Sequence, residues 1–486
     1  MAEPQAPGAP TGAPASANAP PGAKFLEGNL LRHVATMALS ASVGLVSVFL
    51  VDLADLWFIS LLGEAELAAA VGFAGTLLFL VFSAAIGLAI AVAALVAPRV
   101  GRGELEEART VAGGAMLAGV ALFALLTACA FALRGEAMTL LGAEGRTHAL
   151  AVEFLTIVLP AMPFGAIGMM GSAVLRAHGD ARRAMQVTLW AGGVNAVLDP
   201  VLIFGLDLGL DGAAWATVAA RAAMAATAVI AVVRHYRGFA LPGPGRLLAD
   251  LRALLAIAGP AVLTNVATPV GNGIATRAIA PFGDGVVAAW AVIGRLVPLA
   301  FCALFAVSGA VGPIVGQNAG AERHDRVREA LVRALQFVAL AVLVSWTLLA
   351  LARPLIVEAF GLGEDGARLV GWFALAVAPL WLFNGALFVS NAAFNNLRRP
   401  LWATWLNWGR NTLGVAPFVW IGAQVAGAPG VLVGQALGGL LFALLGLRLA
   451  FSLVDGYASG RLDREGHRLP PLMRARPEAP FASPRG

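Results

Sequence analysis

Three aspartates lie inside long apolar stretches of this sequence, where a carboxylate needs a reason to be retained. Asp52 and Asp55 stand late in the first apolar stretch, and Asp199 stands late in another, within "NAVLDPVLIFG". A carboxylate at the centre of a membrane-spanning helix costs about 3 kcal/mol on insertion scales, so an acid that is kept there predicts a functional site. The chemistry available to such acids is the uptake and release of a proton or a small cation.

Distance along the helices predicts that several of these groups meet. Asp55, Asp199 and Thr217 each lie about six residues from the nearest loop on one side of the membrane, which at 1.5 Å of rise per residue is roughly 9 Å below that boundary. Asn195 shares the face of Asp199 one turn deeper. We therefore expect one hydrated pocket with Asp55, Asn195, Asp199 and Thr217. Two carboxylates in a poorly solvated pocket repel each other, so one should hold a proton near neutral pH.

Other polar residues in the apolar stretches have plainer alternatives. Asp52 could be an acid that reaches outward to water, and a packing hydrogen bond is the alternative for Asp199. The basic and amide residues are expected to be interhelical ties, although they could line a cavity against an anionic ligand. They are Arg221, Arg277, Arg295, and Arg410 with Asn407 and Asn411 on one polar stripe. The sequence shows no cluster of catalytic or metal-binding residues, so neither a catalytic site nor a metal site is predicted, and no cofactor is expected.

The composition is that of an integral membrane protein. Of 486 residues, 59% are hydrophobic and 13% are charged, with a mean hydropathy of +0.81, more than the surface of a water-soluble protein allows. The net charge of +5 says little about partners, and no nucleic-acid binding is inferred from it. The Pro-, Ala- and Gly-rich start predicts a disordered cytoplasmic leader over residues 1–28, and residues 456–486 are expected to form a cytoplasmic tail.

Twelve apolar segments separated by short polar breaks predict an all-α polytopic membrane protein. A bilayer core about 30 Å thick needs roughly 20 apolar residues per helix. The segments lie near residues 33–60, 67–98, 110–133, 150–175, 184–205, 212–233, 253–281, 286–315, 330–352, 368–393, 401–424 and 429–452.

The arginines predict the orientation of these segments. The even-numbered connections carry most of them, whereas the odd-numbered connections carry few and hold acids. By the positive-inside rule, the even connections and both termini face the cytoplasm.

The two halves of the chain also resemble each other. "FISLLGEAELAAAVG" at residues 58–72 matches "ATRAIAPFGDGVVAAWAV" at residues 275–292 at an offset of 220 residues. Because six spans separate the copies, both halves have the same orientation. This parallel repeat predicts two pseudo-symmetric six-helix lobes, over residues 29–240 and 241–455, with a cavity between them, an architecture more typical of transporters than of enzymes.

Four stretches, in this order and spacing, resemble the multidrug and toxic compound extrusion (MATE) family. They are "DLWFISLLGEAELAAAVG", "LRAHGDARRAM", "NAVLDPVLIFGLDLGLDGAAWATV" and "GPIVGQNAGA". The resemblance implies export of lipophilic, often cationic, xenobiotics or metabolites, driven by an H⁺ or Na⁺ gradient. It further implies a monomer in the bacterial cytoplasmic (inner) membrane, among membrane lipids.

The resemblance also implies roles for particular residues. Asp55 stands where the family has its first-helix coupling acid, and the remaining three pocket residues match the polar trio of the DinF-type branch: Asn195, Asp199 and Thr217. The stretches "GPAVLTNVATPVGNG" and "LAVAPLWLFNGALF", where the NorM-type branch has acids, contain none. Coupling is therefore expected in the first lobe alone.

Two other functions are alternatives. A flippase for a lipid-linked saccharide, from the same broader superfamily, would favour more spans and an arginine-lined cleft with Arg295 and Arg410 facing it. A membrane-embedded enzyme would need a nucleophile with its base, or metal ligands, within the spans. The histidines instead lie singly in loops, near a boundary or in the tail, so an enzyme is not expected.

Overall fold

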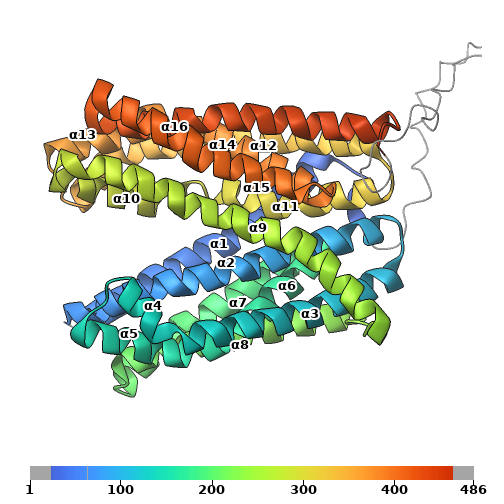
Figure 1. Cartoon of the computed structure of the whole chain (residues 1–486), viewed down its shortest axis with the longest axis horizontal. Coiled ribbons are helices and arrows are strands. Elements are labelled where there is room, and N and C mark those ends of the chain that lie inside the picture. The colour runs from blue at the N-terminus through green and yellow to red at the C-terminus, as the bar shows by residue number, and fades with distance from the viewer. Residues whose placement is uncertain (1–22, 63, 463–486) are drawn as a thin grey trace, which may run out of the picture.

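The computed structural model describes residues 23–62 and 64–462, and every secondary-structure element there is helical (Figure 1). The first half contains α1 (Leu30–Leu61), α2 (Ala65–Gly101), α3 (Leu105–Ala132), α4 (Arg134–Leu140), α5 (Gly145–Val158), α6 (Met162–Ala177), α7 (Ala181–Pro200) and α8 (Gly209–Tyr236). The second half contains α9 (Pro244–Ile279), α10 (Asp284–Ala300), α11 (Cys302–Gly320), α12 (His324–Ala359), α13 (Glu364–Trp372), α14 (Trp381–Asn396), α15 (Pro400–Gly409) and α16 (Val415–Ala458). Short 3₁₀ and π turns connect several of these helices into longer continuous helical segments.

Eleven helical runs in the described residues are long and apolar enough to cross a membrane, and the last of them is two spans. Within α16, Gly427 has a φ of 63° and a ψ of −142°, which a glycine adopts without strain. The backbones on either side fold back on each other, because a Cβ on Gly422 would overlap the carbonyl group of Gly430, and one on Gly438 would overlap that of Gly414. The described residues therefore contain twelve spans, as predicted.

The predicted span at 286–315 is made of two helices rather than one. Helix α10 ends at Ala300 and α11 begins at Cys302, and Phe301 between them leaves the helical conformation with a φ of −110° and a ψ of 24°. Phe301 stacks on Trp381 with ring centroids 4.7 Å apart. This aromatic contact anchors the break inside the core of the second lobe.

The helices form two groups, α1–α8 and α9–α16, with α9 crossing between them (Figure 1). The start of α9 packs on α3, where a Cβ on Gly114 would overlap the carboxylate of Asp250. Farther along, Thr404 of α15 donates a hydrogen bond of 2.8 Å to the carbonyl oxygen of Pro260. Helix α9 therefore belongs to the second lobe and also binds it to the first.

The two lobes make their tightest backbone contact at the end where the arginine-rich connections lie. Helices α2 and α11 end there at Gly101 and Gly320, which hold matching places in the two halves of the chain. A Cβ on Gly101 would overlap the carbonyl group of Gln317, and one on Gly320 would overlap that of Pro98. Figure 1 shows the ribbons of the two lobes converging at this end and diverging toward the other.

The prediction of a disordered leader is wrong for its last part, residues 23–28. Residues 1–22 lie outside the described chain, but residues 23–28 fold between the lobes around a 3₁₀ turn at Lys24–Leu26. Phe25 is only 2% exposed, and its backbone N–H donates a 3.0 Å hydrogen bond to Oε1 of Gln317. The amide of Asn318 donates in turn to the carbonyl oxygen of Phe25 at 3.1 Å. Burial of one aromatic ring and these buried backbone partners hold a segment whose composition indicated disorder.

Candidate functional site

Close packing of α1 against α7 creates the site in the first lobe. A Cβ on Gly192 would lie 2.8 Å from Oγ of Ser47, and a Cβ on Gly44 would lie 3.3 Å from Cβ of Thr188. Gly192 therefore needs to be glycine for the two helices to approach so closely, and Gly44 lies in similarly close contact. One or two turns farther along, this approach places the polar side chains of the two helices opposite each other.

Asn195 joins two of the predicted acids. Its side-chain Nδ2 donates to Oδ1 of Asp55 at 2.9 Å and to Oδ2 of Asp199 at 2.8 Å. Asp199 is 0% exposed and Asn195 5% exposed, and the two carboxyl groups are close enough to interact electrostatically. We call Asp55, Asn195 and Asp199 the acid–amide trio.

One carboxylate oxygen of the trio remains without a donor. Oδ1 of Asp199 is buried and has no hydrogen-bond partner in the described structure. A buried oxygen in this state costs free energy that an added proton or cation would recover. Asn195 cannot supply it, because both N–H groups of its amide already serve the two acids.

The end of α7 places Asp199 where the helix changes its winding. Pro200 follows directly and closes the regular helix, and residues Val201–Gly205 form a π turn. Wide turns of this kind are frequent at functional sites because they shift side chains out of the regular register. The same stretch leads into the loop before α8.

The other two predicted residues, Thr217 and Asp52, make no described hydrogen bond to the trio. The Thr217 hydroxyl donates to the carbonyl oxygen of Ala213 in its own helix, at 3.0 Å, and no hydrogen bond to the trio is described for it. Asp52 is exposed and interacts electrostatically with Arg221 of α8 and with Asp55 of its own helix. The sequence showed that Asp52 and Arg221 are both charged residues within spans. It did not show which way each side chain faces on its helix, so their pairing could not be predicted.

A second polar set lies inside the second lobe. Arg410 donates through Nη1 to the side-chain oxygen of Asn384 and through Nη2 to Oδ1 of Asn411, at 3.4 Å in the latter case. Asn407 is buried and donates to Oδ1 of Asn391 at 3.1 Å. The polar stripe predicted on this span therefore forms interhelical ties, whereas Arg295 lies exposed on α10.

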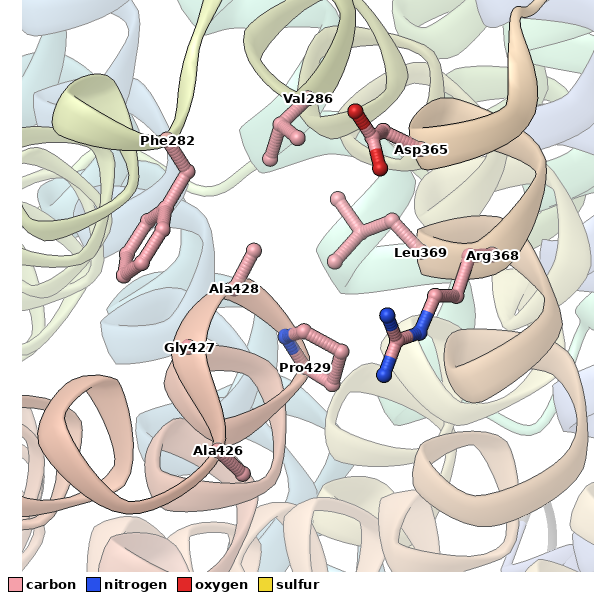
Figure 2. A pocket seen from close by; sticks show the side chains of 9 residues that line it. All are labelled: Phe282, Val286, Asp365, Arg368, Leu369, Ala426, Gly427, Ala428 and Pro429. Carbon is pink, nitrogen blue, oxygen red and sulfur yellow. The ribbon is translucent and has the colours of Figure 1, made fainter.

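A pocket of about 230 Å³ lies elsewhere, at the end of the second lobe opposite the arginine-rich connections (Figure 2). It is enclosed by α10, α13 and the turn of α16, and is lined by Phe282, Val286, Asp365, Arg368, Leu369 and residues 426–429. Figure 2 shows Asp365 and Arg368 at its edge with Leu369 between them. The trio is in the other lobe, so this pocket is not the site of the acids. In the described part of the chain, no three histidine, cysteine or acidic side chains gather to hold a metal ion.

Comparison with known proteins gives consistent results. The MatE family model matches residues 41–201 and 260–421, one stretch in each half. The chain is 26% identical over 419 residues to a protein of Shewanella oneidensis named FAD transporter, covering 85% of this chain and 92% of that one. It is 22% identical over 302 residues to the multidrug export protein MepA of Staphylococcus aureus, covering 60% and 66%. The crystal structure of the Vibrio cholerae MATE transporter VcmN in the bent form superimposes with a TM-score of 0.81 at 26% identity, covering 88% of this chain and 98% of that one.

Proposed function

Because this chain belongs to the MatE family of membrane transporters, we propose that it is a secondary active exporter coupled to an ion gradient at the acid–amide trio. Its substrates are lipophilic, often cationic, drugs or metabolites, and the ion is H⁺ or Na⁺. The observation that carries the proposal is the position of Asn195 between Asp55 and Asp199, with one oxygen of the buried Asp199 lacking a donor.

The trio supports ion coupling because it ties two helices together through charge. Asp55 belongs to α1 and Asp199 to α7, so their mutual repulsion acts across that interface when both are ionised. A proton on Asp199, or Na⁺ bound by the carboxylate and amide oxygens, removes this repulsion. Such an ion shifts the balance between two conformations only as far as it binds one of them more tightly.

The direction of transport follows from the same arrangement. The trio lies toward the end of the molecule opposite the arginine-rich connections, which we place in the cytoplasm of a bacterium by the positive-inside rule. Protons entering from outside would reach the trio while the cytoplasmic end is closed by the contact between α2 and α11. They would lower the affinity for bound substrate and favour the return to the inward-open state.

Efflux from inverted membrane vesicles tests the proposal. A fluorescent cationic dye is followed under an imposed pH gradient and, separately, under a Na⁺ gradient, for Asp55→Asn and Asp199→Asn. Each variant should lose at least about tenfold of gradient-driven efflux, since each removes an ionisable group of the trio while keeping its size.

Asp52→Asn is the comparison variant, because Asp52 lies on the same helix as Asp55, is exposed and makes no described hydrogen bond to the trio, although its charge acts on Asp55. It should lose much less efflux than either trio variant. Full activity of both trio variants under both gradients would refute coupling at this site.

A further inference from the structure

The second lobe holds a partly buried positive charge, Arg410, that forms no ion pair among the described residues. The Arg410 guanidinium remains ionised under all physiological conditions, and Nε is completely buried without a partner. In the described residues no carboxylate forms a salt bridge with it. An isolated charge in a poorly polar interior is unfavourable unless an opposite charge or several acceptors compensate it.

The depth of Arg410 explains why no acid of the lobe can reach it. Arg410 lies ten residues from the start of α15, about 15 Å into the membrane at the rise of a helix. The acids of this lobe lie near the helix ends or in loops: Asp250, Asp284, Glu322, Asp325, Glu329, Glu358, Glu364, Asp365 and Asp455. The middle of the lobe is therefore positively charged, in contrast to the acids of the first lobe.

The groups around Arg410 provide more hydrogen-bond donors than acceptors. A guanidinium has five N–H groups, and only two contacts to amide oxygens, from Asn384 and Asn411, are made, the second of them long at 3.4 Å. The Asn411 amide nitrogen donates to the carbonyl oxygen of Asn407 at 2.9 Å, so Asn411 supplies its oxygen to Arg410 alone. The side chain of Arg410 is only partly buried as a whole, which leaves part of it accessible.

We propose that Arg410, with Asn384, forms an anion-binding subsite in the second lobe that takes the carboxylate or phosphate group of an exported compound. The guanidinium fork suits two oxygens of one such group, and the bound anion supplies the charge that the lobe lacks. This inference rests on the proposed export function and refines its substrate class. The exporter then combines a cation site in one lobe with an oxyanion site in the other.

Binding to the purified, detergent-solubilised protein tests the subsite with pairs of compounds that differ only in an anionic group. Riboflavin is compared with flavin mononucleotide, and rhodamine 6G with its free acid, by fluorescence titration. For at least one pair the wild type should bind the anionic member about tenfold or more tightly than its partner. Arg410→Gln should abolish this preference and leave the affinity for the uncharged or esterified member unchanged.

Asn384→Asp gives a second variant that does not depend on removing the arginine. The new carboxylate would pair with Arg410 in place of the anion, so this variant should melt at a higher temperature and also lose the anion preference. A purely structural Arg410 predicts the gain in melting temperature without any change in ligand preference. Arg295→Gln, which removes an exposed arginine of another span, should keep the wild-type preference.

The inference is overturned if the wild type prefers neither anionic compound, or if Asn384→Asp and a folded Arg410→Gln keep the preference. Efflux of rhodamine 6G from inverted vesicles is measured on the same variants. Export that persists without any anion preference would reject the subsite alone, whereas a wild type that exports no dye under either gradient would reject the proposed function.

Discussion

Gln317 should control how firmly the arginine-rich end of the transporter is closed. Its side chain is 0% exposed, accepts from the backbone N–H of Phe25 at 3.0 Å and donates to the carbonyl oxygen of Ala177 at 2.7 Å. It therefore connects α11 of the second lobe to the end of α6 in the first lobe and to the N-terminal segment. Replacement by methionine keeps the length of the side chain and removes both bonds.

The loss can be estimated from these two contacts. Each buried partner left unpaired costs about 1–3 kcal/mol, so Gln317→Met should destabilise the closed end by about 3 kcal/mol, roughly a 100-fold change in the opening equilibrium. Hydrogen–deuterium exchange of the peptides that contain Phe25 and Ala177 measures this opening directly, and both should exchange up to about 100-fold faster. Gln336→Met, at an exposed position of α12, is the control and should exchange like the wild type. Equal exchange in Gln317→Met and the wild type at both peptides would refute the reasoning.

Two further predictions concern the same end of the molecule. Asp180 caps α7 and accepts hydrogen bonds from Arg183 and from the hydroxyl of Tyr236, at 2.6 and 2.9 Å. Burial alone would raise the pKa of Asp180, but these hydrogen bonds outweigh burial and hold the pKa below its ordinary value. The contribution of ionised Asp180 to stability is thus present above about pH 4, the ordinary pKa of an aspartate, and is lost as the pH falls through the lowered pKa. Asp180→Asn should therefore cost about 1–2 kcal/mol of stability at pH 7 and flatten the acid side of the plot of melting temperature against pH. An unchanged plot would contradict this. Gly101→Ala and Gly320→Ala should each separate α2 from α11, and each should lower the yield of folded protein or reduce its melting temperature by several degrees. Gly309→Ala in α11 is the control and should be neutral, because the added carbon meets nothing within 4 Å. Equal behaviour of all three variants would show that the close contact is not needed.

Much of the fold could be predicted because the membrane imposes a simple rule. A span needs a minimum length of apolar residues, so the twelve spans and two lobes could be read from the order of apolar stretches and breaks. Depth follows from the same rule, since position along a helix is proportional to residue number. For this reason the meeting of Asp55 and Asp199 could be predicted without coordinates.

Contacts around the helix axes could not be predicted in this way. The Thr217 hydroxyl donates within its own helix, and the amide of Asn195 links the two acids. The direction in which a side chain points depends on how each helix is rotated against its neighbours, and that rotation is set by the glycines of α1 and α7 packing against side chains of the opposite helix. A single sequence does not reveal which side chain of another helix such a glycine packs against.

The sequence by itself determined which charges lie in the membrane and how deep, because hydrophobic length and the rise of a helix depend only on the order of residues. Tertiary structure alone decided which hydrogen-bond partners these charges have. It placed Asn384 beside Arg410 from another helix, and it folded residues 23–28 into the interface between the lobes. Both outcomes arise from the packing of segments far apart in the chain, where burial and hydrogen bonding are satisfied only after the lobes have assembled.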